Sequence, residues 1–123
     1  MNISNNYKYY KGYEGEPEII FRYLNNPNIS IHIWEGYIDD IMRNQPGTDE
    51  DYRNGLSYDW NTMNGPYGDE NKNIINLDNY YKDLLRFKKT KFKFEETKEV
   101  YDLIMNFLKQ AVDDKQKVEL IIE

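Results

Sequence analysis

The pattern that most constrains the fold is a change of period near the end of the sequence. Six apolar residues recur at offsets of 0, 3, 4, 7, 8 and 11, which is the spacing of one face of an α-helix: Val100, Leu103, Ile104, Phe107, Leu108 and Ala111. Shortly afterwards Val118, Leu120 and Ile122 alternate with their neighbours, which is the period of a β-strand. Because a lone strand is not stable in water, this strand must join a sheet formed elsewhere in the chain. The succession predicts a protein of the α+β class.

The other elements are predicted from local signals. Ile29, Ile31 and Ile33 alternate with Ser30, His32 and Trp34, which predicts a strand over 29–34. Glu16-Pro17 is typical of a helix start, so a helix is expected from there to the Asn25-Asn26-Pro27 stop, with Ile19, Ile20, Tyr23 and Leu24 on one face. Further helices are expected over 36–44 and from Asn76 or Asp78 to about Phe87, the latter burying Leu77, Tyr81, Leu84 and Leu85. Short strands are expected over 56–60 and 92–94.

These elements predict a single compact α+β domain over residues 1–123. A small, mostly antiparallel sheet is expected to pack against three to four helices. A long acidic and aromatic-rich segment at about 45–76 lies between the predicted halves of this arrangement. Such long segments are usually functional.

The negative charge of the chain is concentrated in one region. The net charge is −6, and residues 35–70 hold nine carboxylates against two arginines, a balance of −7. The same region carries aromatic side chains of the kind that dominate binding hot spots. We therefore expect a docking surface for a basic partner, made of Glu35, Tyr37, Asp39, Asp40, Asp49, Glu50, Asp51, Tyr52, Tyr58, Asp59, Trp60, Tyr67, Asp69 and Glu70.

Composition limits the other possibilities. The chain has no cysteine, which excludes disulfides and thiolate chemistry and fits a reducing compartment. No run approaches the roughly eighteen apolar residues of a transmembrane helix, and no signal peptide is recognisable at the start. We expect a cytoplasmic protein, monomeric or homodimeric, that does not bind a membrane.

No motif predicts catalysis, a metal or a cofactor. An EF-hand loop starting at Asp49 would place Arg53, Asn54 and Trp60 at ligand or glycine positions, so the motif fails. Asp39 and Asp40 are adjacent and point apart on a helix, which disfavours a glycosidase-like carboxylate pair. His32 is the only histidine, and a structural role with a neighbouring partner is favoured over that of a general base.

The one basic cluster is Lys88, Lys89, Lys91 and Lys93, interleaved with phenylalanines. Lysines with aromatics can bind single-stranded nucleic acid. Here the phenylalanines are expected to belong to the core, and the excess of carboxylates repels a polyanion, so no nucleic-acid binding is expected. The tyrosines at 7, 9, 10 and 13 are expected to pack in the core or to form a recognition patch.

A small, cysteine-free, acidic α+β protein with an aromatic-studded acidic segment resembles the immunity proteins that protect bacteria from their own contact-dependent or polymorphic toxins. The resemblance covers composition and the order of elements and includes no diagnostic motif. It implies a non-catalytic inhibitor that binds a cognate toxin C-terminal domain in the cytosol, often a nuclease with a basic cleft. Two alternatives remain open: an intracellular adaptor or regulatory domain, and a small carboxylate-dependent hydrolase.

Overall fold

The computed structural model describes residues 6–43, 55–56, 60 and 74–123. Four strands form one sheet in the order β1-β3-β2-β4: β1 (Asn6–Tyr9), β2 (Glu18–Tyr23), β3 (Ser30–Trp34) and β4 (Val118–Ile122). The pairs β2/β3 and β2/β4 are antiparallel, whereas β1 runs parallel to β3. The expected α+β class and the mostly antiparallel sheet are confirmed.

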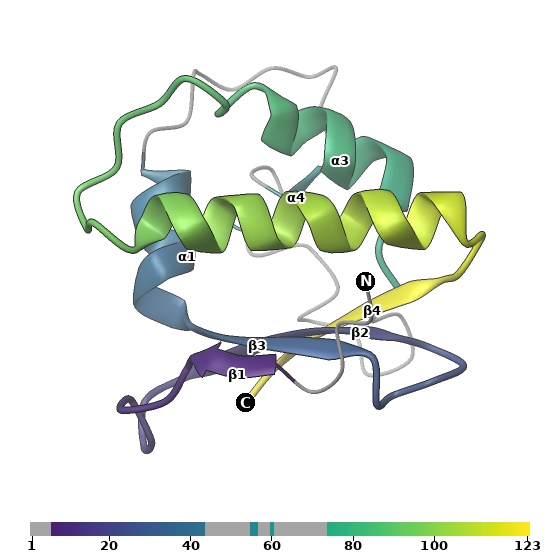
Figure 1. Cartoon of the computed structure of the whole chain (residues 1–123), viewed down its shortest axis with the longest axis horizontal. Coiled ribbons are helices and arrows are strands. Elements are labelled where there is room, and N and C mark those ends of the chain that lie inside the picture. Colours follow the sequence, from purple (N-terminus) through teal and green to yellow (C-terminus); the bar gives the residue numbers. More distant parts are fainter. Residues whose placement is uncertain (1–5, 44–54, 57–59, 61–73) are drawn as a thin grey trace.

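Helices cover one face of this sheet (Figure 1). They are α1 (Glu35–Met42), α3 (Leu77–Leu85) and α4 (Thr97–Asp113); α1 and α4 contact β3, and α3 packs on α4. The shared core joins alternate residues of the strands to the apolar faces of α1 and α4, and it includes Phe21, Ile31, Ile33, Ile38, Ile104, Phe107 and Leu120. The helix expected from the apolar face Val100–Ala111, the helix after β3 and the terminal strand are therefore confirmed.

The predicted helix at 17–24 is wrong, because this segment is β2. Ile19, Phe21 and Tyr23 point into the core at every second position, and Ile20, buried as well, lies on the opposite face. Four of the six residues of β2 are β-branched or aromatic, which favours a strand. The Asn25-Asn26-Pro27 segment is the connection of a β2–β3 hairpin, closed by hydrogen bonds of 3.0 Å from the Tyr23 amide to the Ile29 carbonyl and from the Ile29 amide to the Asn26 carbonyl.

Two further short strands were expected, and those of their residues that the structure describes do not form strands. Of the segment 56–60, Leu56 and Trp60 are described, and both are helical. Residues 92–94 belong to the connection between α3 and α4. α3 forms as expected, with the Asn76 side chain accepting a hydrogen bond of 3.2 Å from the Asn79 amide, but it buries Tyr80, Asp83 and Leu84, whereas Leu85 is exposed.

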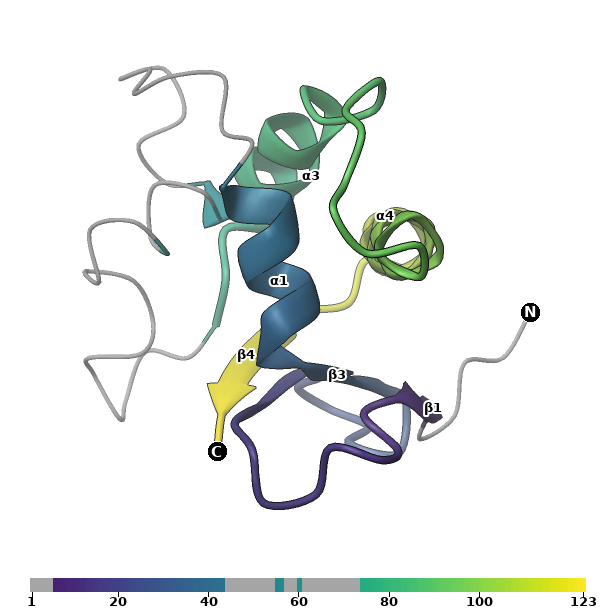
Figure 2. The same ribbon diagram turned by 90° about the vertical axis from the view of Figure 1, so that its left-hand side faces the viewer.

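The opposite face of the sheet is approached by the connection between β1 and β2, which passes beneath the strands (Figure 2). Gly12 and Gly15 have a φ of 95° there, a conformation that L side chains rarely adopt. The edge of β4 is partly paired as well, because the Ile75 amide donates to the Val118 carbonyl at 3.0 Å. In the part of the chain that the structure describes, no helix is long and apolar enough to cross a membrane.

Candidate partner-binding surface

Three carboxylates and two tryptophans meet where β3 passes into α1. Trp60 donates a hydrogen bond of 2.9 Å from its indole nitrogen to the carboxylate of Asp39. The indole nitrogen of Trp34 likewise donates to the carboxylate of Glu16 at 3.4 Å. Burial raises the pKa of Glu35, and the charges of Asp39 and Glu16 raise it further. We call Glu16, Trp34, Glu35, Asp39 and Trp60 the acidic aromatic surface.

The tryptophan of this surface at position 34 is held by a stack of rings. Tyr13 lies parallel to Trp34 with 4.1 Å between the ring centroids, and Tyr37 meets both rings edge-on. Phe94 packs on Trp34 from the α3–α4 connection. A side chain with so many ring contacts has little rotamer freedom left, so a partner that binds it meets a preformed surface.

Tyr37 and Asp40 were expected to contact a partner, but the structure buries both side chains. Tyr37 is 5% exposed and Asp40 is 1% exposed. Both lie on the face of α1 that points into the molecule, whereas Glu35 and Asp39 are half-buried at its margin. Asp39 and Asp40 point in different directions because successive residues on an α-helix do not share a face.

Asp40 has an internal role. Its carboxylate accepts hydrogen bonds from the Lys93 amide (2.9 Å), the Phe94 amide (2.8 Å) and the Thr97 hydroxyl (2.6 Å). Burial alone would raise the pKa of Asp40, but these hydrogen bonds and the charge of Arg43 outweigh it, so the pKa lies below its ordinary value. Asp40 thus connects α1 to the segment that leads into α4.

Most of the other expected contact residues fall outside the described part of the chain: Asp49, Glu50, Asp51, Tyr52, Tyr58, Asp59, Tyr67, Asp69 and Glu70. The structure therefore brings together Glu35, Asp39 and Trp60 from the expected set. It adds Glu16 and Trp34, which the sequence analysis did not include. Trp34 directly precedes α1 in the sequence, whereas Glu16 was assigned to a helix start, so only knowledge of the sheet could place Glu16 beside α1.

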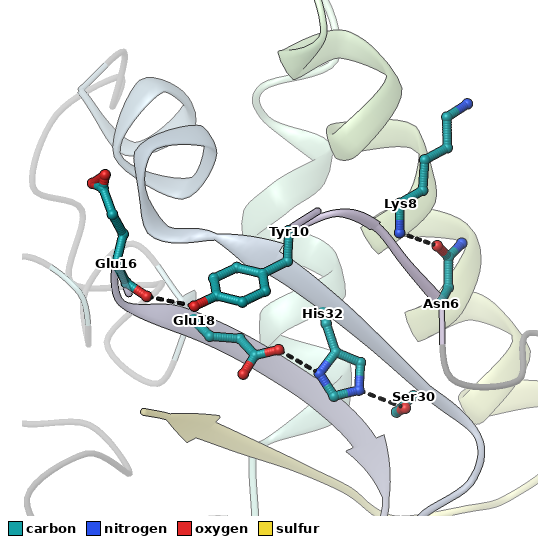
Figure 3. A network of polar contacts seen from close by, with 7 residues as sticks. All are labelled: Asn6, Lys8, Tyr10, Glu16, Glu18, Ser30 and His32. Carbon is teal, nitrogen blue, oxygen red and sulfur yellow. Dashed lines mark hydrogen bonds and ion pairs between the residues drawn. The ribbon is translucent and has the colours of Figure 1, made fainter. Parts of the chain in front are cut away.

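A second polar group lies on the opposite face of the sheet (Figure 3). His32 is held on both sides, with Nδ1 at 2.7 Å from a carboxylate oxygen of Glu18 and Nε2 at 3.0 Å from the hydroxyl of Ser30. Tyr7 stacks on the imidazole with 3.9 Å between ring centroids. The neighbouring partners expected for the His32 ring are present.

The order hydroxyl, imidazole and carboxylate is that of the relay in serine hydrolases. A nucleophile must reach its substrate, however, and Ser30 is 1% exposed. A neighbouring pocket of about 450 Å³ is lined by Tyr7, Lys8, Tyr10, Lys11, Glu14 and Glu18, and Ser30 is not among its walls. Glu18 is thus the member of this group that lines the pocket, and the group connects β2 to β3 through its hydrogen bonds.

Within residues 6–43, 55–56, 60 and 74–123, no three His, Asp or Glu side chains are grouped so that they could hold a metal ion. Comparison with protein-family models, with curated proteins and with solved structures finds no match for this chain.

Proposed function

We propose that this protein is a non-catalytic binding protein of the immunity type, which neutralises a cognate toxin domain in the bacterial cytoplasm. It docks its acidic aromatic surface on a basic region of that domain, such as the active-site cleft of a nuclease. The proposal draws on the general resemblance to immunity proteins and on the concentration of negative charge in residues 35–70.

The observation that carries the proposal is the grouping of Glu16, Glu35 and Asp39 around two tryptophans. Like charges placed together cost free energy, and burial together with the charges of Asp39 and Glu16 raises the pKa of Glu35. A cationic group of a partner would offset the repulsion among these carboxylates. Complementary charge also speeds the encounter of two proteins, while a half-buried aromatic anchor such as Trp60 slows their separation.

The proposal is tested with the C-terminal domain of the large secreted protein expected to be encoded immediately upstream. That domain is expressed in a bacterial host with and without this protein, and growth is recorded. Purified proteins are then mixed, and association and dissociation rates are measured at several salt concentrations. Rescue of growth together with tight binding is expected; binding without rescue would favour the adaptor alternative.

Two variants connect the result to the surface. Glu35→Gln with Asp39→Asn removes two charges. The new amide at position 39 still has an oxygen that can accept the hydrogen bond from Trp60, so slower association and a weaker salt dependence are expected from the loss of charge. Glu99→Gln with Asp113→Asn removes the same charge from exposed positions on α4 and serves as the control. If both pairs change the association rate equally, the acidic aromatic surface does not bind the partner.

A further inference from the structure

The connection between α3 and α4 (Figure 1) contains a cluster of lysines. We call residues 88–93 the lysine loop. Lys88, Lys89, Lys91 and Lys93 are all exposed. Among the described residues, none of these four ammonium groups forms an ion pair, whereas neighbouring Arg86 pairs with Asp83 and Lys98 pairs with Asp102.

The aromatic side chains of this connection point the other way. Phe87 is fully buried, and Phe92 packs on Tyr101 with 5.7 Å between ring centroids. Phe94 lies against Trp34 and Tyr37. The expected division, with buried or half-buried phenylalanines and exposed lysines, is present without the expected strand. The ammonium group of Lys93 lies 5.7 Å from the centroid of the Phe94 ring.

The backbone of the lysine loop is fixed at both ends. At its start the Lys88 amide donates to the Leu85 carbonyl at 3.2 Å and the Thr90 amide donates to the Phe87 carbonyl at 3.0 Å. At its end the buried carboxylate of Asp40 holds the Lys93 and Phe94 amides and the Thr97 hydroxyl. A charged segment held in this way loses less conformational entropy on binding than a free one does.

We propose that the lysine loop is a preorganised docking surface for an acidic segment of a partner protein. Four exposed lysines that form no ion pair with the described residues attract carboxylates, and the fixed backbone limits their spacing. The inference does not depend on the proposed function. The acidic aromatic surface would bind cationic groups, whereas the lysine loop would bind anionic groups.

A nucleic acid fits this surface less well. Proteins bind single strands by stacking bases on aromatic side chains, and the phenylalanines of the loop are engaged in the core. The net charge of −6 also repels a long polyanion. A short acidic segment contacts the loop alone and is repelled less by the rest of the protein.

The test uses two fluorescently labelled probes on the full chain: a short poly-glutamate peptide and a single-stranded DNA that carries the same number of negative charges. Binding is followed by fluorescence anisotropy at several salt concentrations, and backbone amide shifts in NMR spectra locate the site. We expect salt-dependent binding of the peptide with shifts centred on residues 88–93. DNA binding as tight as that of the peptide, or shifts centred elsewhere, would overturn the proposal.

The charge requirement is tested with matched triple variants. Lys88→Gln, Lys89→Gln and Lys91→Gln together should weaken peptide binding by about tenfold or more, because the close charges act jointly. Lys11→Gln, Lys109→Gln and Lys117→Gln together remove equal charge from exposed positions elsewhere in the chain. An equal loss of affinity in both triple variants contradicts a dedicated loop surface.

The role of the fixed backbone has a distinct signature. Asp40→Asn removes a negative charge, so charge alone predicts tighter binding of the acidic peptide. A preorganised loop predicts the opposite, since the amide group cannot accept from two backbone amides and a hydroxyl as the carboxylate does. Thr97→Val removes one of these contacts at unchanged charge and should also weaken binding. Unchanged or tighter binding in both variants refutes preorganisation, and Thr97→Val answers the question even if Asp40→Asn does not fold.

Discussion

The hydroxyl of Thr97 donates a hydrogen bond of 2.6 Å to the carboxylate of Asp40, a residue 57 positions earlier in the chain. Both side chains are buried, at 0% and 1% exposure. This contact joins the middle of α1 to the first residue of α4, and it makes the stability of the protein depend on one carboxylate.

Asp40→Ala is expected to destabilise the protein by about 3 kcal/mol or more, because two backbone amides and one hydroxyl lose their shared acceptor. Chemical denaturation of the variant and the wild type measures the difference. Asp113→Ala, at an exposed position of α4, should change the free energy of unfolding little. A loss below about 1 kcal/mol would show that other groups satisfy these donors.

The stability that Asp40 supplies should also depend on pH. Its pKa is lower in the folded protein than in the unfolded chain, so its contribution is present above the unfolded value of about 3.9. As the pH falls through the lower folded pKa, the contribution is lost. The difference in unfolding free energy between wild type and Asp40→Asn should therefore be largest near neutral pH and shrink in acid. A constant difference from neutral pH into acid would contradict this assignment.

Glu35 should titrate above its ordinary range, because of burial and the charges of Asp39 and Glu16. Asp39→Asn is expected to lower the pKa of Glu35 part of the way, whereas Asp113→Asn should leave it unchanged; NMR titration of the side-chain carboxyl measures both. Since a bound cation favours the ionised form, affinity for a basic partner should fall as the pH drops through the Glu35 pKa. An unchanged Glu35 pKa in Asp39→Asn would show that the charge of Asp39 does not influence the titration of Glu35.

Gly36→Ala should disturb the ring stack. A Cβ at this position would lie 2.3 Å from the indole ring of Trp34, which must then move. Because Tyr13 and Phe94 confine that ring, we expect a loss of about 1 to 3 kcal/mol and a changed near-ultraviolet circular dichroism spectrum. A wild-type spectrum and melting temperature would mean that the ring has room to shift.

Phe107→Ala should cost about 3 to 5 kcal/mol, since the ring is 1% exposed and packs edge-on against Tyr23 of β2. Thermal or chemical denaturation is the measurement. Val112→Ala, at an exposed position of the same helix, is the matched control. Equal effects of the two substitutions would show that α4 packs through another face.

The sequence predicted those elements whose periodic pattern is long or clearly bounded. The face of α4 from Val100 to Ala111 and the alternation in β3 and β4 were correctly identified. β2 was mistaken for a helix because proline before a run of apolar residues is typical of both element types. The run Ile19-Ile20-Phe21 is buried on both faces of the sheet, which removes the alternation that would distinguish it.

The candidate surface was predictable only in part. Charge concentration indicated Glu35 and Asp39, but nothing in the local sequence distinguishes Asp39 from Asp40. Their roles diverge because α1 points one toward Trp60 and the other toward the Lys93 amide. The fixed end of the lysine loop likewise depends on the contact between Asp40 and the Lys93 amide. These residues lie more than fifty positions apart, so no local sequence pattern predicts the contact.

The parallel pairing of β1 with β3 has a consequence for motion. β1 is short, lies at the sheet edge and carries Tyr7, which is 50% exposed and rests on His32. The strands β2, β3 and β4 with α1 and α4 hold the core largely without it. We therefore expect β1 to open locally while the rest of the molecule remains folded, so that its amides exchange with solvent hydrogen well before those of β2.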